Sequence, residues 1–256
     1  MSHREQLEYL SEVARANQHL VMGGRILEIG SYNVNGTMRQ AFAGASEYIG
    51  VDLVDGPGVD IVSFGHEVEF PDASFDLAVS GECFEHDPHW SETFLSMIKA
   101  TRPGGVVAFT CASKGRPEHG TRRTDATWSP GTQWVGLDYY RNLSEVDFKD
   151  ALDLADFFDR WQFSYMRTSF DLYFTGVRRA TPHQRDPIGA LPDPSTIASI
   201  RRATKLRQRF ARLPLTTADR ILPDDRYQDF AIRYVKSVRW LRSHRVTRTR
   251  PTGQFV

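Results

Sequence analysis

Two carboxylates and an imidazole lie within five residues of one another in the run Glu82-Cys-Phe-Glu-His86. A second histidine, His119, lies in the polar run Arg116-Pro-Glu-His-Gly-Thr-Arg-Arg123. Imidazole titrates near neutrality, so either histidine could remove a proton from a hydroxyl group. The alternatives are structural, with His86 capping a turn and His119 lying on a surface loop. The candidate catalytic residues are Glu82, Glu85, His86 and His119.

A second constellation is typical of nucleoside binding. The run Ile26-Leu-Glu-Ile-Gly30 predicts a strand that ends in a tight glycine turn, and Asp52 follows 22 residues after Gly30, at the end of the next predicted strand. Open α/β sheets bind nucleotides at the carboxyl edge of their strands. An aspartate placed there can accept hydrogen bonds from both ribose hydroxyls. The alternative is a plain turn between strand and helix, with an exposed aspartate.

The residues after Gly30 indicate which nucleoside derivative would fit. Tyr32 and Asn33 replace the glycines that would cradle a pyrophosphate, and no Gly-Lys-Ser/Thr sequence of a P-loop occurs. A site without a phosphate cradle but with an acid at Glu28 suits a cationic ligand instead. S-adenosylmethionine carries an amino group and a sulfonium, and nearby carboxylates favour both.

Alternating strands and helices must position these residues. A helix is expected over 4–20, and Ser144 can cap another over 145–158. Strand and helix alternation through residue 111 predicts a doubly wound, mainly parallel α/β sheet. Only two residues separate the last two strands, so they must form an antiparallel hairpin. The expected strands are 25–30, 47–52, 58–62, 76–80, 106–111, 163–167 and 170–177, with further helices at 37–43 and 90–100.

The net charge of zero hides an uneven distribution along the chain. Residues 1–177 carry 14 Lys and Arg against 26 Asp and Glu, whereas residues 178–256 carry 18 against 6. We therefore expect a domain over 1–177 and a basic extension over 178–256, in which a proline-containing linker precedes amphipathic helices over 197–213 and 227–241. The extension could dock on the body, form a homodimer, or bind an anionic partner.

The motifs in residues 20–177 together resemble the class I S-adenosylmethionine-dependent methyltransferases. The resemblance rests on LEIGS with Gly36, on YIGVD ending in Asp52, on FPDASFDLAVSGECFEH and on RPGGVVAFT. The Gly-x-Gly-x-Gly run of that family is degenerate, because Tyr32 and Val34 replace its later glycines. The resemblance implies a seven-stranded Rossmann-like sheet and S-adenosyl-L-methionine as cofactor. It assigns the cofactor to Glu28, Gly30, Ser31, Gly36, Asp52, Leu53, Gly65, His66, Glu67, Ser80 and Gly81.

The expected reaction is transfer of a methyl group to a small molecule, most simply to a hydroxyl of a sugar or secondary metabolite. The stretch Asp138-Tyr-Tyr-Arg-Asn142 could line the acceptor pocket or could pin the loop over 112–143 to the body. The acceptor-binding candidates are Tyr139, Tyr140 and Asn142. Mg²⁺ is an additional candidate cofactor, although no cluster of carboxylates has a spacing that requires a metal.

Two rival functions use the extension differently. An RNA methyltransferase would clamp nucleic acid with the arginine-rich segment, although the acidic body makes nucleic acid an unfavourable partner. A non-catalytic binding protein would keep the fold and use the extension for a partner or a membrane surface. No apolar run reaches the ~20 residues of a transmembrane helix, and the charged N-terminus lacks a signal-peptide core. We therefore expect a cytoplasmic protein.

Overall fold

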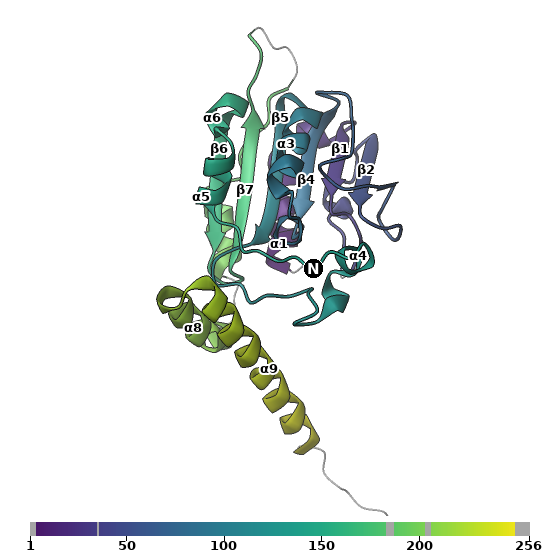
Figure 1. Ribbon diagram of the computed structural model, residues 1–256. Helices are drawn as coiled ribbons and strands as arrows, with labels where there is room; N and C mark the ends of the chain where they lie inside the picture. The colour runs from purple at the N-terminus through teal and green to yellow at the C-terminus, as the bar shows by residue number, and fades with distance from the viewer. Residues whose placement is uncertain (1–3, 35, 183–186, 203–205, 249–256) are drawn as a thin grey trace, which may run out of the picture.

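A computed structural model describes residues 4–34, 36–182, 187–202 and 206–248, and its centre is one seven-stranded sheet (Figure 1). The strand order is β3-β2-β1-β4-β5-β7-β6. Neighbours from β3 to β5 run parallel, and β7 runs antiparallel to both β5 and β6. This confirms the predicted fold class. The strands are β1 Arg25–Ile29, β2 Glu47–Asp52, β3 Ile61–Val62, β4 Phe75–Gly81, β5 Thr101–Ala112, β6 Phe158–Met166 and β7 Asp171–Arg178.

Helices cover both faces of the sheet. On one face the apolar side of α1, with Tyr9 and Leu10, packs on Leu77 of β4. On the other face Phe94 of α3 and Phe148 of α5 pack on the strands. Because central strands are buried on both sides, they are apolar almost without interruption. The helices on the sheet are α1 Arg4–Ala16, α2 Gln18–Val21, α3 Trp90–Ala100, α5 Glu145–Ala151, α6 Leu154–Phe157 and α7 Pro194–Arg202.

Several element boundaries differ from the sequence expectations. The helix expected over 145–158 is two helices, α5 and α6, because the backbone is extended at Leu152 and Asp153 caps the second helix. The strand expected over 106–111 begins earlier, at Thr101. The Pro-Gly-Gly run after Arg102 therefore lies inside β5, where the pairing with β4 shifts register. The helix expected over 37–43 is the 3-10 turn η1, Arg39–Phe42.

The C-terminal extension packs on the body through two separate groups of residues. Ile197 and Ile200 of α7 belong to the core beside α1. Further along, Leu215 of α8 and Tyr227 of α9 pack with Phe170, next to the turn between β6 and β7. The helix expected over 197–213 therefore falls in two elements, and residues 203–205 between them lie outside the described part. The two later helices are α8 Leu206–Ile221 and α9 Asp224–Arg248.

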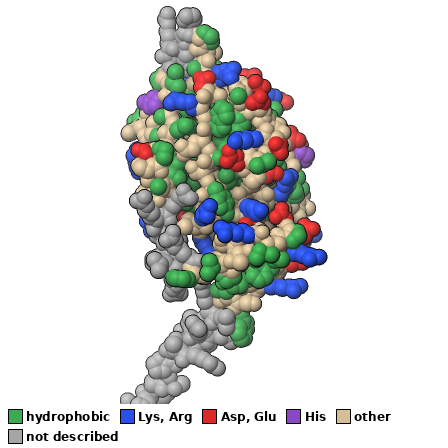
Figure 2. Space-filling model, turned by 90° about the vertical axis from the view of Figure 1, so that its left-hand side faces the viewer, with side chains coloured by type: hydrophobic (Ala, Val, Ile, Leu, Met, Phe, Trp, Pro, Cys, Tyr) green, Lys and Arg blue, Asp and Glu red, His purple; other side chains and the backbone are tan. Residues whose placement is uncertain are grey.

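On the face shown in Figure 2, acidic and basic side chains are interspersed over the body. Figure 2 shows Lys and Arg side chains near the level where the C-terminal helices meet the body, and hydrophobic side chains on the helices below. Phe210, Leu213 and Ile221 are among the exposed apolar residues of α8, and the expected homodimer stays a prediction. Within the described ranges, no helix is both long and apolar enough to cross a membrane.

Candidate functional site

A cleft opens at the carboxyl ends of β1, β2 and β4, where parallel strands of an open sheet place their ligands. Gly30, Asp52 and Gly81 line it at the three strand ends. The segment that includes η3 (Ala126–Trp128) and α4 (Pro130–Trp134) closes the other side. The cleft holds about 890 Å³ of empty space, open solvent included.

Asp52 is held in position by the backbone and keeps capacity to bind a ligand. Its Oδ2 accepts a hydrogen bond from the Tyr32 amide at 2.9 Å, and its Oδ1 accepts one from the Leu53 amide at 2.7 Å. A carboxylate offers about four lone-pair sites, so two sites remain for a pair of hydroxyl donors. Burial raises the pKa of Asp52. A Cβ atom on Gly131 would lie 3.0 Å from Oδ1, so the cover lies directly over this carboxylate.

Gly30 allows a close approach of two elements at the cleft floor. Its φ of +81° lies in the left-handed region, and a Cβ atom there would be 2.7 Å from the Cβ of Cys83. The predicted tight turn is therefore present and needs glycine. The residues expected to contact the cofactor that do line the cleft are Gly30, Asp52, Leu53, Gly65 and Gly81.

The other six residues expected at the cofactor do not line the cleft. Glu28 points to the α1 side of the sheet, where its Oε2 accepts a hydrogen bond from the Tyr48 hydroxyl at 2.6 Å. His66 turns away to stack on His89, with ring centroids 4.1 Å apart. Their roles, like that of the adenine contact at Gly65-His66-Glu67, stay predictions. The residues outside the lining are Glu28, Ser31, Gly36, His66, Glu67 and Ser80.

Replacing Glu28 by glutamine is expected to flatten the pH dependence of stability. Burial raises the pKa of Glu28 to about 7 in the folded chain, whereas an unfolded chain loses this proton near ~4.3. The stabilising contribution is therefore complete below about pH 4 and falls by about 4 kcal/mol as the pH rises through about 7. Urea unfolding at about pH 5 and about pH 8 measures the difference between the two proteins. Equal losses in wild type and variant would contradict this prediction.

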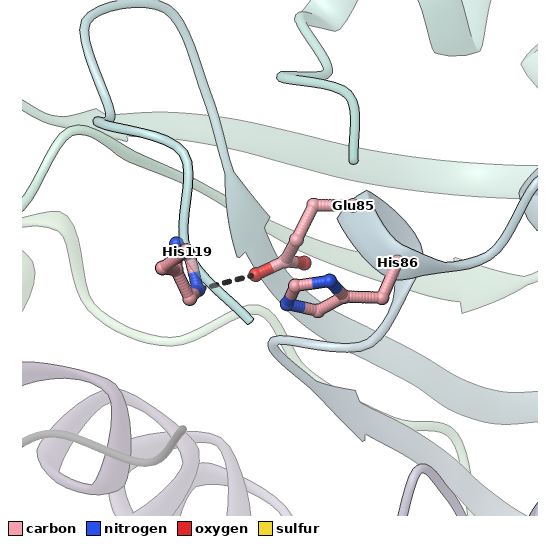
Figure 3. A group of neighbouring side chains, drawn as sticks. All are labelled: Glu85, His86 and His119. Carbon is pink, nitrogen blue, oxygen red and sulfur yellow. Dashed lines mark ion pairs between the residues drawn. The ribbon is translucent and has the colours of Figure 1, made fainter. Parts of the chain in front are cut away.

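Glu85, His86 and His119 form a buried cluster beside the cleft (Figure 3). Glu85 and His86 lie in the short turn η2 (Phe84–His86) after β4, and His119 lies in the loop after β5. The His119 Nε2 and Glu85 Oε1 atoms are 3.9 Å apart, and the two imidazole centroids are 5.1 Å apart. The three residues are 0%, 5% and 3% exposed, so the alternative that His119 lies on a surface loop is wrong.

Burial sets the protonation of this cluster. It raises the pKa of Glu85 to about 8 and lowers the pKa of His86 to about 3. It also lowers the pKa of His119 well below its ordinary value. The expectation that a histidine here titrates near neutrality is therefore wrong for the unliganded chain. Both rings are neutral at pH 7, and their nitrogen lone pairs are available to a ligand.

Further charges surround the cluster. Glu82 accepts a hydrogen bond from the Thr110 hydroxyl at 3.2 Å and has a φ of +53°, which is strained for a residue with a side chain. The Arg116 guanidinium lies 3.7 Å from a Glu82 oxygen and 3.2 Å from an Asp171 oxygen. All four predicted catalytic residues are therefore in one buried, charge-rich region.

Tyr140 and Asn142 connect the loop after β5 to the buried cluster. The Tyr140 hydroxyl donates to Asn142 Oδ1 at 2.9 Å, and Asn142 Nδ2 donates to the Arg116 carbonyl at 2.9 Å. The Tyr140 ring lies 5.4 Å from that of His86 and 5.0 Å from that of His119. Neither Tyr139, Tyr140 nor Asn142 lines the cleft or the second cavity described below. Of the two alternatives for Tyr140 and Asn142, these contacts favour a role in holding the loop.

A second cavity, with about 980 Å³ of empty space including open solvent, lies on the other side of His119, between the loop and the C-terminal helices. Trp128 lines both cavities, whereas His86 faces the first and His119 the second. The extension contributes Arg212, Lys236 and Arg239 to its wall. Sequence reasoning missed this cavity, although the amphipathic, arginine-rich helices were a signal that the extension has a surface to cover.

The family model of a methyltransferase domain matches residues 1–165. The chain belongs to this family. The match spans β1 to β6, and therefore the cleft and the buried cluster, and it confirms the resemblance to the class I methyltransferases. No protein of curated function matches the sequence.

Solved structures with a similar fold include three methyltransferases. The 1,6-didemethyltoxoflavin-N1-methyltransferase of Burkholderia thailandensis, solved with S-adenosylhomocysteine, is 19% identical with a TM-score of 0.47, over 68% of this chain and 79% of that one. Phosphoethanolamine N-methyltransferase 2 of Haemonchus contortus is 17% identical with a TM-score of 0.45, over 66% and 56%. A methyltransferase of Mesorhizobium loti is 19% identical with a TM-score of 0.43, over 67% and 100%.

Proposed function

We propose that the chain transfers the methyl group of S-adenosylmethionine to a hydroxyl group of a small molecule, such as a sugar or a secondary metabolite. The observation that carries this proposal is the position of the buried cluster between two cavities. One cavity has the strand-end aspartate that suits a nucleoside, and the other leaves room for an acceptor. As part of the same proposal, residues 1–177 supply the cofactor site and residues 178–256 an accessory wall.

The cleft residues fit the cofactor. The two lone pairs that remain on Asp52 match the paired hydroxyls of a ribose, and Gly30 and Gly81 let the ligand lie against bare backbone. S-adenosylmethionine supplies a methyl group on a positively charged sulfur. The nearby acids Glu82 and Asp87 line the same cleft and favour that positive charge.

Methyl transfer is an in-line displacement, so the protein mainly has to position the acceptor. A hydroxyl acceptor in the second cavity would reach the cleft beside His119, His86 and Trp128. The neutral imidazoles can accept the hydroxyl hydrogen bond and direct an oxygen lone pair at the methyl carbon. Arg212, Lys236 and Arg239 also favour an acceptor with an acidic group.

Replacing Asp52 by alanine is expected to weaken S-adenosylmethionine binding by more than about tenfold, because a hydrogen bond to a charged group contributes about 1.5–3 kcal/mol. Calorimetric titration of the cofactor measures the change. Asp55→Ala is the matched control, because Asp55 is exposed three residues further on and does not line the cleft. Equal S-adenosylmethionine affinity in wild type and Asp52→Ala would show that the ribose does not bind at Asp52.

A further inference from the structure

The cluster of Glu85, His86 and His119 has more polar atoms than hydrogen-bond partners. Among the described residues, five side-chain atoms of the cluster form no regular hydrogen bond. They are both carboxylate oxygens of Glu85, both ring nitrogens of His86 and the Nε2 of His119. The Tyr139 backbone interacts with the His86 ring without reaching that geometry. Leaving a buried polar atom unpaired costs about 1–3 kcal/mol. Five such atoms in one place indicate a ligand that satisfies them together.

The side chains are arranged to converge on such a ligand. One ligand atom from each residue lies within 4.8 Å of the other two, and Figure 3 shows the three side chains turned toward one another from two separate segments. The His119 Nδ1 lies 3.3 Å from the Pro117 carbonyl. This contact places the ring proton on Nδ1 and leaves the Nε2 lone pair toward Glu85, as in histidines that bind metals.

The surrounding charges favour a positively charged ligand. Glu82, Glu85 and Asp171 are three carboxylates whose side chains are 0% exposed. Arg116 pairs with two of them, Glu82 and Asp171. Glu85 offers its carboxylate beside the two imidazoles, and these acidic surroundings attract a cation bound there.

We infer that Glu85, His86 and His119 bind a divalent transition-metal ion. Two imidazoles and one carboxylate are a ligand set of catalytic zinc sites, in which a fourth position stays open, and also of iron(II) sites. Mg²⁺ prefers oxygen ligands alone, so the earlier expectation of Mg²⁺ does not suit these side chains. Ligands at ~2.0–2.1 Å from a tetrahedral ion are about 3.3 Å apart, so the cluster contracts on binding.

The location of the ion gives it a role, which rests on the proposed function. His86 faces the first cavity and His119 the second, so the open position lies where a hydroxyl acceptor would meet the methyl donor. An oxygen bound to a divalent ion loses its proton far more readily than a free hydroxyl. The neutral histidines would then act as ligands of the ion rather than as the base.

The test is calorimetric titration with Zn²⁺ of the full chain after dialysis against a chelator. We expect the wild type to bind one ion per chain with micromolar or tighter affinity. Glu85→Gln and His119→Ala should each weaken zinc affinity by more than about a hundredfold. Replacing a residue that only orients a ligand has a smaller effect on metal affinity. His89→Ala is the matched control, because that ring is exposed and stacks on His66 outside the cluster. Co²⁺ should give the visible spectrum of a site with nitrogen and oxygen ligands in wild type only.

Two outcomes would overturn the inference: no zinc binding by the wild type, or equal zinc affinity in wild type, Glu85→Gln and His119→Ala. The melting temperature and S-adenosylhomocysteine affinity of each variant show whether the fold and the cleft remain intact. If the chain binds zinc but not the cofactor, the metal site stands and the proposed function fails. If it binds the cofactor but not zinc, the proposed function stands and the metal site fails.

Discussion

Replacing His86 by alanine is expected to lower kcat at least about a hundredfold while affinity for S-adenosylmethionine changes little. The His86 side chain lines the first cavity, whereas Asp52, which we propose holds the ribose, accepts its hydrogen bonds from the Tyr32 and Leu53 amides. Helping a hydroxyl to lose its proton contributes about 10²–10⁴ in rate, and this contribution disappears with the imidazole. Transfer of labelled methyl groups into a metabolite extract measures the rate, and calorimetry measures the cofactor affinity.

His119→Ala is the comparison that separates the two roles of the cluster. If both histidines hold an ion, both replacements lower kcat to a similar extent, and this is the result we expect. If His119→Ala changes only the KM of the acceptor, the proposed reaction stands but the metal inference fails. Wild-type turnover in both variants would exclude a hydroxyl acceptor activated at this cluster.

Truncation after Val177 is expected to lower the free energy of unfolding by about 5 kcal/mol or more. The removed segment includes Ile197, Ile200, Leu215 and Tyr227, each at most 5% exposed. Full burial of a large apolar side chain contributes about 1.5–3 kcal/mol, and much of that is lost. Since small proteins are stable by only about 5–15 kcal/mol, the truncated chain should melt far earlier or fail to accumulate in soluble form.

A point variant separates docking of the extension from gross damage. Tyr227→Ala removes a 2% exposed ring and its hydroxyl hydrogen bond to the Gly115 carbonyl, and large-to-small changes of this kind cost about 3–5 kcal/mol. Phe210→Ala, at a position 69% exposed on α8, should change stability by less than about 0.5 kcal/mol. Unchanged melting of the truncated chain and of Tyr227→Ala would show that the helices form an independent arm.

The strands and the cleft could be predicted because their signals are local. Apolar runs mark β1, β4 and β5, and parallel strands bring Gly30, Asp52 and Gly81 to one edge without any knowledge of packing. The N-cap at Ser144 also follows from the sequence alone, and the structure adds a hydrogen bond from the Ser144 amide to Asp147 Oδ2. These features depend on residues close in sequence or on one rule of sheet topology.

The rest depends on packing between distant segments. His86 and His119 lie 33 positions apart, and no spacing rule places their rings 5.1 Å from each other. Burial then shifts the pKa of Glu85 and of both histidines away from the values that motivated their selection. The second cavity needs α8 and α9 to fold back over the loop, and sequence periodicity indicates an apolar face but not what it covers.

Because different parts of the chain line the two cavities, their sequences can diverge independently in evolution. Residues between 29 and 137 line the first cavity, whereas side chains from positions 212 to 239 form much of the wall of the second. Substitutions on α8 and α9 can therefore reshape the second cavity or reverse its charge without disturbing the strand ends. Under the proposed function, related chains could acquire new acceptor specificities by exchanging their C-terminal helices, while the cofactor-binding cleft stays unchanged.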